Sequence, residues 1–335
     1  MAKITTYDFI ASNTRRTIML MALFPVSLVV LVYLAIILFS FITSSGGGHH
    51  YGHVYVSPLT TANLAAMRVL PVISAIAILW LIISYFFGQK FILSGTGAVE
   101  LTRENAQDII RIVENLAITA GLPMPKVYAI NDEALNAFAT GRDPEHSYVV
   151  LTKGIINKLE KPELEGVIAH ELSHIRNRDI RLMLIMILCI SFATVVAELL
   201  LRFALLSRGG GNSKNRGNQQ LFLFILAMVF YLYGYLVAPL IKLAVSRTRE
   251  FQADASAALM TRNPQGLIGA LKKISGNSMV DKLKDKQTMA AMCIVTPLSP
   301  EKQNSFFSKI SGLFATHPPI EERIKALMTM DGYRE

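Results

Sequence analysis

Four apolar stretches, each about as long as a lipid bilayer is thick, constrain this sequence more than any other feature. A helix that crosses the hydrocarbon core needs roughly 20 mostly apolar residues. The stretches cover about residues 17–43, 69–88, 180–206 and 221–243. The first is too long for the apolar region of a secretory signal, and no small-residue cleavage site follows it. We therefore predict four transmembrane helices, the first of which is an uncleaved anchor.

The composition also indicates a membrane protein. Hydrophobic residues make up 52% of the 335 residues and charged residues only 17%, whereas soluble proteins carry roughly 25% charged residues. The chain is too apolar to be intrinsically disordered. Its net charge of +9 does not indicate nucleic acid binding, because the basic residues follow the ends of the apolar stretches and form no stripe. We expect the lipid bilayer as a partner, and no nucleic acid.

Basic residues near the ends of the stretches predict the orientation, since Lys and Arg collect on the cytoplasmic side. Arg15 and Arg16 precede the first stretch, whereas only Arg68 stands in the loop after it. Basic residues also stand at the start of the third stretch and after the fourth. The loop between these two stretches contains basic residues too, but they are a weaker signal. The balance places both termini and the two long polar segments, about residues 89–179 and 244–335, in the cytoplasm.

We expect a mainly α-helical fold with a small β-sheet, in which four transmembrane helices accompany a cytoplasmic domain. Short β-branched runs predict strands at residues 126–130 and 148–152, and a further short strand at 136–140. Helical spacing predicts a helix over residues 101–121, with Thr102 as its N-cap. Along the chain, the predicted segments are an N-terminal anchor with two membrane helices (1–88), a first cytoplasmic part (89–179), a transmembrane hairpin (180–243) and a second cytoplasmic part (244–335).

The pattern H-E-x-x-H, formed by His170, Glu171 and His174, indicates a zinc site. It lies in a segment that begins at Lys161, with Pro162 near its start, and apolar residues recur there at steps of three and four, which predicts a helix. Residues four apart share one helical face, so both imidazoles can bind one Zn²⁺ ion. Zinc lowers the pKa of a bound water to about 7, and the neighbouring glutamate can accept its proton. With 7 histidines in the chain, a chance match is rare, and we predict one catalytic zinc per chain.

A catalytic zinc needs a third protein ligand and one open position. If the third and fourth stretches form a hairpin, the chain after Leu243 returns to the membrane face that carries the motif. There Glu250 and Asp254 stand four apart on a predicted helix over residues 247–259. We predict Glu250 as the third ligand and Asp254 as a carboxylate that accepts a hydrogen bond from a liganding histidine. The solvated start of an amphipathic helix is the alternative interpretation.

Four motifs together resemble HtpX-type membrane zinc metalloproteases, which are relatives of the type I CAAX prenyl proteases. The resemblance covers nearly the whole chain, and its motifs are AHELSHIRNRD (169–179), SRTREFQADA (246–255), NAFATG (136–141) and THPPIEERI (316–324). It implies a zincin-like (gluzincin) catalytic domain. It also implies His170, His174 and Glu250 as zinc ligands and Glu171 as the general base.

The resemblance assigns further roles to two weaker motifs. It implies that His317 and Arg323 stabilise the oxyanion of the reaction, a task suited to cations and N–H donors. It also implies an edge segment to which an extended peptide substrate adds as a strand, made of Asn136, Ala137, Phe138 and Ala139. Taken by itself, His317 is equally consistent with an ordinary loop histidine. Core packing of Phe138 is the alternative for the edge segment, and it is compatible with substrate binding there.

We therefore expect an integral-membrane zinc metalloendopeptidase whose partners are polypeptide substrates. The resemblance implies that it cleaves misfolded or damaged membrane proteins at the cytoplasmic face of the bacterial inner membrane, in stress response and protein quality control. A CAAX-type prenyl-protein processing protease, which uses the same chemistry, is one alternative.

A non-enzymatic metal transporter or sensor is the other alternative. It would use His49, His50 and His53 in the glycine-rich loop after the first stretch, although their spacing defines no closed metal site and a solvated loop is the simpler interpretation. Transport would also require polar groups inside the bilayer. The third stretch holds one acid, Glu198, and Arg202 four residues later favours a local ion pair.

Overall fold

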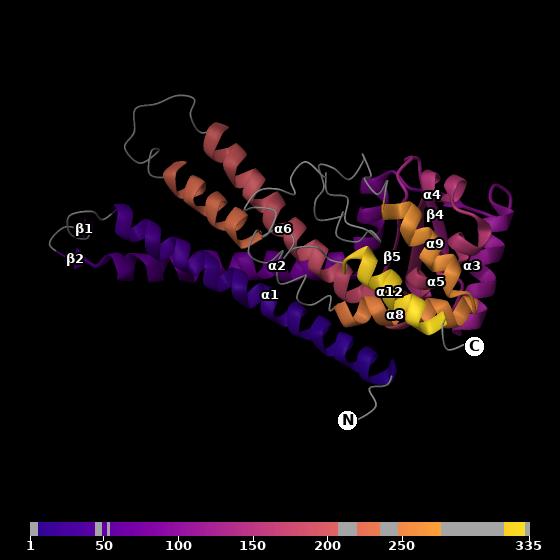
Figure 1. Ribbon diagram of the computed structural model, residues 1–335. Helices are drawn as coiled ribbons and strands as arrows, with labels where there is room; N and C mark the ends of the chain where they lie inside the picture. The colour runs from indigo at the N-terminus through magenta and orange to yellow at the C-terminus, as the bar shows by residue number, and fades with distance from the viewer. Residues whose placement is uncertain are drawn as a thin grey trace. The chain divides into compact units, whose positions relative to one another are not determined.

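The computed structural model describes residues 6–43, 49–51, 54–206, 220–234, 247–275 and 318–331 (Figure 1). The chain separates into two compact units. We call residues 1–17, 85–187 and 239–335 the sheet unit, and residues 18–84 and 188–238 the helix unit. The predicted division of the chain into four segments stays a prediction.

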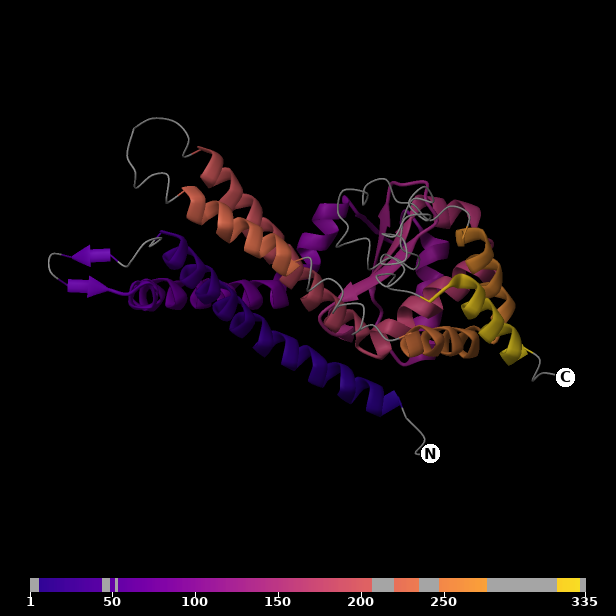
Figure 2. The ribbon, with the colours of Figure 1, turned by 60° about the vertical axis from the view of Figure 1, so that its left-hand side comes forward.

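A mixed four-stranded sheet with the strand order β3-β4-β6-β5 forms one layer of the sheet unit (Figure 2). β3 (Val99–Leu101) runs antiparallel to β4 (Lys126–Ile130), which runs parallel to β6 (Ser147–Thr152). β5 (Ala137–Gly141) runs antiparallel to β6 at the other edge of the sheet. The three strands predicted from β-branched and short apolar runs all form, each within one residue of its predicted bounds.

The α-helix α5 (Lys161–Arg176) is the central helix of this unit. It packs against β5 and β6 of the sheet and against the helices α3 (Gln107–Ala120), α8 (Arg247–Thr261) and α9 (Pro264–Ser275). α12 (Ile320–Asp331) packs against α8 and α9. The short helix α4 (Lys153–Lys158) also lies in this unit.

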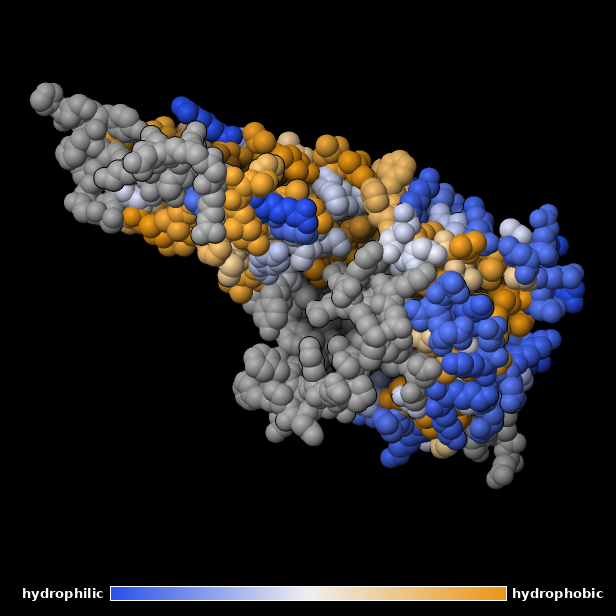
Figure 3. Space-filling view, turned by 90° about the horizontal axis from the view of Figure 1, so that it is seen from above, coloured by the Kyte–Doolittle hydropathy of each residue, from blue (hydrophilic) through white to orange (hydrophobic). Residues whose placement is uncertain are grey.

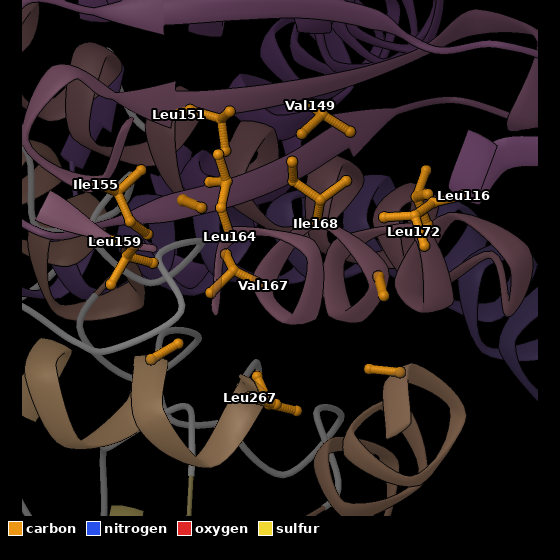
Figure 4. Packing of buried hydrophobic residues seen from close by; sticks show 14 of the residues in the cluster. Leu116, Val149, Leu151, Ile155, Leu159, Leu164, Val167, Ile168, Leu172 and Leu267 are labelled. Carbon is orange, nitrogen blue, oxygen red and sulfur yellow. The ribbon is translucent and has the colours of Figure 1, made fainter. Parts of the chain in front are cut away.

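The predicted motif helix is confirmed as α5, and its sequence explains both its start and its position. A capping box between Glu160 and Glu163 satisfies amides of the first turn. The five apolar residues of the predicted period are all buried, and several of them meet the sheet on one side and α9 on the other (Figure 4). Burial of each stabilises the fold by roughly 1.5–3 kcal/mol. The residues are Leu164, Val167, Ile168, Leu172 and Ile175.

Two glycines allow α5 and α9 to approach each other at backbone distance. A Cβ atom at Gly166 would lie 2.8 Å from the amide nitrogen of Leu267, and one at Gly266 would lie 2.4 Å from the carbonyl oxygen of Pro162. Neither distance is compatible with a larger side chain unless the backbone moves. The close helix pair therefore depends on both glycines.

The helix predicted over residues 101–121 is shorter than expected. Leu101 ends β3, and α3 begins at Gln107. Thr102 forms a turn instead of an N-cap: its N–H donates to Oδ1 of Asn105 and its carbonyl oxygen accepts from the N–H of Ala106. The predicted start was wrong because the strand and the turn use the backbone groups that a longer helix would need.

Three helices in the described part of the chain are long and apolar enough to cross a membrane. They are the apolar part Thr14–Thr43 of α1 (Thr6–Thr43), α2 (Pro58–Thr96) and α6 (Asp179–Leu206). Three of the four predicted spans are thus confirmed as apolar helices, although α2 begins well before its predicted start. The fourth is described only as a shorter apolar helix, Gln220–Gly234, and the rest of residues 221–243 lies outside the described part, so this span stays a prediction.

Aromatic contacts and exposed apolar side chains characterise the helix unit. Phe192 of α6 meets the rings of Phe24 and Trp80 with centroids 5.7 Å and 5.4 Å away, and Trp80 Nε1 donates to the carbonyl oxygen of Leu188. Apolar residues dominate the visible surface of the long helices, in contrast to the hydrophilic cover of the sheet unit (Figure 3). Such a surface is unfavourable in water and suits lipid. It includes Leu23, Val26, Val30, Leu34, Val72, Ile76 and Leu79.

Two further sequence predictions concern the helix unit. The ion pair between Glu198 and Arg202 in α6 is confirmed. The glycine-rich loop after α1 holds a short hairpin, in which β1 (His49–Tyr51) pairs antiparallel with β2 (Val54–Val56). The prediction of a loop was therefore wrong for these residues. His53 lies outside the described residues.

Candidate metal centre

Two helices bring together the predicted zinc-binding residues. α5 carries His170, Glu171 and His174, and α8 packs closely against it and carries Glu250 and Asp254. All five side chains are buried, the most exposed being His174 at 8%. The separation of four residues within each helix places each pair on one face. The structure thus joins two motifs that are about 80 positions apart in the sequence.

Three potential ligand atoms converge. Nε2 of His170 lies 3.2 Å from Nε2 of His174. The Glu250 carboxylate lies 3.7 Å from the first of these nitrogens and 3.6 Å from the second. Ligands bound at 2.0–2.1 Å to a tetrahedral zinc ion are separated by roughly 3.3 Å. The donor set therefore fits zinc in both its chemistry and its spacing.

A carboxylate and a guanidinium stand behind His170. Its Nδ1 lies 2.9 Å from Oδ1 of Asp254, a distance that suits the predicted hydrogen bond from a liganding histidine to this carboxylate. Arg323 of α12, fully buried, donates from Nε and Nη2 to the two Asp254 oxygens at 2.8 Å and 2.6 Å. Burial alone would raise the pKa of Asp254, but the Arg323 charge and hydrogen bonds, together with His170, lower it to about 2. Asp254 is thus held ionised behind the ring.

A second carboxylate stands behind His174. Its Nδ1 lies 3.0 Å from Oδ2 of Asp179, the first residue of α6. The other oxygen of Asp179 accepts from Nη1 of Arg249 at 3.3 Å. Burial alone would lower the pKa of His174, but the hydrogen bond to Asp179 and the charges of Glu250, Asp179 and Glu171 outweigh burial and raise it to about 9. These carboxylates create a strong preference for positive charge at the site.

The sequence did not lead us to predict Asp179 and Arg249 as part of the centre. Both stand inside the quoted motifs, Asp179 five residues after the second histidine and Arg249 next to the proposed third ligand. An acidic residue shortly after a metal-binding motif could have indicated Asp179 as a candidate partner, because liganding histidines commonly donate their second N–H to a carboxylate.

Glu171 follows His170 directly, so the two side chains leave the helix about 100° apart. Glu171 is 3% exposed, and its charge contributes to raising the pKa values of His174 and Arg323. It is therefore electrostatically coupled to the centre without belonging to the three-atom ligand set. Its role as general base stays a prediction.

Of the two residues predicted to stabilise the oxyanion, the structure describes Arg323 but not His317. Arg323 lies at the centre, with Nη1 4.0 Å from Glu250 and Nη2 3.4 Å from both ring nitrogens of His170. Its two hydrogen bonds to Asp254 suit the support of that carboxylate. Contact with a substrate oxyanion stays a prediction. His317 lies outside the described residues.

The predicted substrate segment lies at the sheet edge that packs against α5. Asn136 precedes β5, where its N–H donates to Oγ1 of Thr152 and its Oδ1 accepts from the N–H of Ala137. Asn136 and the five residues of β5, including Phe138 and Ala139, are buried. In the described part of the chain β5 pairs only with β6, so one side of β5 has no strand neighbour. Substrate binding there stays a prediction.

The sequence profile of Peptidase family M48 matches residues 103–331 of this chain, and this range contains every residue of the centre. The chain belongs to peptidase family M48. Among related M48 proteins, "Protease HtpX homolog" of Bacteroides fragilis is 39% identical over 316 residues, covering 94% of this chain and 95% of the relative. The proteins of the same name from Dictyoglomus turgidum and Ligilactobacillus salivarius are 41% identical over 247 residues and 35% identical over 325 residues. These alignments cover 74% and 97% of this chain, and 77% and 99% of the two relatives.

M48 membership and the HtpX-named relatives confirm the predicted resemblance and identify the chain as a metalloprotease. Together with the three apolar helices, they indicate a membrane metalloprotease. The alternative of a non-enzymatic transporter or sensor is not supported. Among solved structures, the "Crystal Structure of S. mikatae Ste24p" matches with a TM-score of 0.39 at 17% identity, over 93% of this chain and 65% of that one. This likeness is too weak to bear on the function.

Proposed function

We propose that this chain is an integral-membrane zinc endopeptidase in which His170, His174 and Glu250 hold one zinc ion. The observation that carries the proposal is the meeting of two imidazole Nε2 atoms and one carboxylate within 3.7 Å. Acceptor atoms that face each other at this distance repel one another unless a cation or a proton lies between them. A zincin-like catalytic domain is part of this proposal.

The charge of the buried cluster supports a divalent cation. With neutral imidazoles and ionised acids, four carboxylates and two guanidiniums leave two negative charges at the centre. Buried charges need compensation, and a divalent ion would supply it. The charged residues, all at most 5% exposed, are Glu171, Asp179, Arg249, Glu250, Asp254 and Arg323.

Zinc, when bound, supplies Lewis-acid chemistry that polarises the scissile carbonyl and makes water acidic near pH 7. In the proposed mechanism Glu171 removes the proton of the attacking water and then donates it to the leaving amine. His317 and Arg323 are proposed to stabilise the negative oxygen of the tetrahedral intermediate. Asp254 keeps His170 oriented throughout the reaction.

We propose that substrates are polypeptides that add to the sheet as a strand beside β5, which presents an edge in the described part of the chain. The distribution of basic residues supports a cytoplasmic active site. The resemblance to HtpX-type proteases supports misfolded or damaged proteins of the bacterial inner membrane as substrates, hence a role in protein quality control.

The deciding experiment is zinc-dependent cleavage of an unfolded reporter protein by the purified chain in detergent, compared with the Glu171→Gln variant. The variant should keep its zinc and lose at least about 100-fold in rate, since general acid–base catalysis contributes roughly 10²–10⁴-fold. A chelator should abolish cleavage by the parent. A zinc-loaded Glu171→Gln variant that cleaves as fast as the parent would refute the proposed mechanism.

A further inference from the structure

Two series of side-chain contacts extend from the candidate metal centre, and each runs from a histidine to a carboxylate and then to an arginine. One joins His170 to Asp254 and then Arg323, as predicted in part. The other joins His174 to Asp179 and then Arg249 through direct contacts between buried groups. Nδ1 of His174 lies 3.0 Å from Asp179, and Asp179 lies 3.3 Å from Arg249. The first series comes from α5, α8 and α12, and the second from α5, α6 and α8.

We propose that Asp179 and Arg249 are positioning residues that set the metal affinity of the centre through His174, an inference that rests on the proposed function. An imidazole that donates Nδ1–H to a carboxylate carries its lone pair on Nε2. Nε2 of His174 is the atom that faces His170 and Glu250. Asp179 thus selects the tautomer and the ring orientation in which His174 can bind a cation.

Arg249 fixes Asp179 in turn. The acid uses one carboxylate oxygen for His174 and the other for Arg249, so the carboxylate plane is held from both sides. Arg249 is adjacent to Glu250 in α8. Any shift of α8 that moved the proposed ligand would therefore also move the group that orients the second histidine, which couples the two ligands mechanically.

A contribution to stability alone does not explain the buried ion pair of Asp179 and Arg249. Buried ion pairs often contribute less to stability than apolar residues of similar volume, because both charges must be desolvated. Nη2 of Arg249 is moreover buried without a hydrogen-bond partner in the described part of the chain, which costs stability. Positioning of His174 accounts for a buried charge arrangement that stability alone would disfavour.

The test measures zinc affinity of the full chain in detergent, by competition with a chromophoric chelator. Asp179→Ala should weaken zinc binding about 10–100-fold, the typical effect of removing a partner behind a liganding histidine. Asp179→Asn, which keeps an acceptor oxygen but loses the charge, should fall between the Ala variant and the parent. Cobalt-loaded Asp179→Ala should show a changed visible absorption spectrum, because the orientation of one ligand changes.

Glu163→Gln is the matched control, because Glu163 is another buried carboxylate, paired with Lys273 at the far end of α5. It should lower the melting temperature and leave zinc affinity within about twofold of the parent. The inference is overturned if Asp179→Ala binds zinc as tightly as the parent. Should that variant not fold, undiminished zinc affinity of Asp179→Asn overturns the inference instead.

Failure of this inference is distinguishable from failure of the proposed function. His174→Ala is measured in the same assay. If it loses zinc while the Asp179 variants retain parental affinity, only the positioning role falls. If His174→Ala and Glu250→Ala both bind zinc as the parent does, the proposed metal centre itself is wrong.

Discussion

Glu250 joins the motif helix to the second half of the site and is the residue on which the proposed ligand set depends. Its carboxylate lies within 3.7 Å of both imidazoles and is 1% exposed. Glu250→Ala should lower the zinc content of the purified protein well below one ion per chain, because two histidines alone form an incomplete site. Elemental analysis after dialysis measures this content. Thr248→Ala, an exposed change on the same helix, should retain the metal.

Asp143 offers a test of electrostatics away from the metal. It accepts hydrogen bonds from the N–H of His146 at 2.7 Å and from Nε of Arg142 at 3.2 Å. Burial alone would raise the pKa of Asp143, but its hydrogen bonds with His146 and the nearby charges lower it. A lowered carboxyl pKa adds stability above the unfolded value of about 3.9, and this stability is lost as the pH falls through the folded value.

Asp143 is the N-cap of the short 3-10 helix Pro144–His146. Asp143→Ala should therefore destabilise the protein by about 1 kcal/mol near neutral pH, the usual cost of a lost N-cap. The difference from the parent should shrink as the pH falls through the lowered folded pKa of Asp143, where the parent carboxylate becomes protonated too. Thermal unfolding monitored by fluorescence across this range measures the effect. A difference that stays constant with pH would contradict the electrostatic explanation. Glu145→Ala, a change at an exposed neighbour, should show neither effect.

Residue types and spacing made His170, His174 and Glu250 predictable, whereas Asp179 was not. The histidine spacing carries its own geometry, because a helix places residues four apart on one face. The contact of Asp179 depends instead on the turn after α5, where Arg178 adopts a positive φ of 58°. Residues other than glycine rarely take this conformation, and no feature of the sequence predicts it at Arg178. The sequence thus shows that an acidic residue follows the motif, but not that its side chain reaches His174.

At the scale of elements, the α5–α9 contact gives a prediction about stability. Gly166→Ala and Gly266→Ala should each destabilise the protein by roughly 1–3 kcal/mol, because the added methyl group would collide with backbone atoms of the opposing helix. Alanine is otherwise the better helix former, so the sign of the effect tests the close approach. Chemical unfolding in detergent measures it. An increase in stability would show that the helices are farther apart.

Lys272→Ala is the control for this pair of changes. Lys272 lies on α9 and is exposed, so its replacement should change stability by no more than about 0.5 kcal/mol. Proteolytic activity should fall together with stability in the glycine variants, since α5 carries the proposed ligands.

Elements with a strong apolar period were predicted well, and elements whose structure is decided by strand pairing were not. The apolar residues of α5 recur with helical spacing and all become buried. The segment before α3 has helical spacing too, but Leu101 pairs with Val127 in the sheet. Strand pairing is a contact between distant residues, so a local pattern cannot reveal which structure prevails. The hairpin of β1 and β2 escaped prediction because its strands are only three residues long.

At the scale of the whole molecule, the distribution of basic residues predicts how the chain crosses the membrane. A fluorescent protein fused after Glu335 should fluoresce, because the proposed C-terminus is cytoplasmic. Alkaline phosphatase inserted between β1 and β2, after Gly52, should be active, because that loop is proposed to lie outside. Fusions expressed in bacterial cells and normalised for protein amount measure both.

The paired fusions serve as controls for one another. Alkaline phosphatase after Glu335 should be inactive, and the fluorescent protein after Gly52 should be dark when exported unfolded. Reversal of all four signals would place the metal centre on the outer face. An active phosphatase at both sites would instead indicate an even number of spans between them, contrary to the three helices predicted after Gly52.

The shortness of the link after α5 limits how this protein can be shortened. Only Asn177 and Arg178 separate α5 from α6, and two residues reach about 7 Å at most. α6 supplies Asp179 to His174 from its first turn, so this long apolar helix begins inside the network around the proposed metal site. A water-soluble fragment trimmed at this border would lose the scaffold that aims Asp179. A truncated form of the enzyme therefore has to keep the first turns of α6 attached to α5.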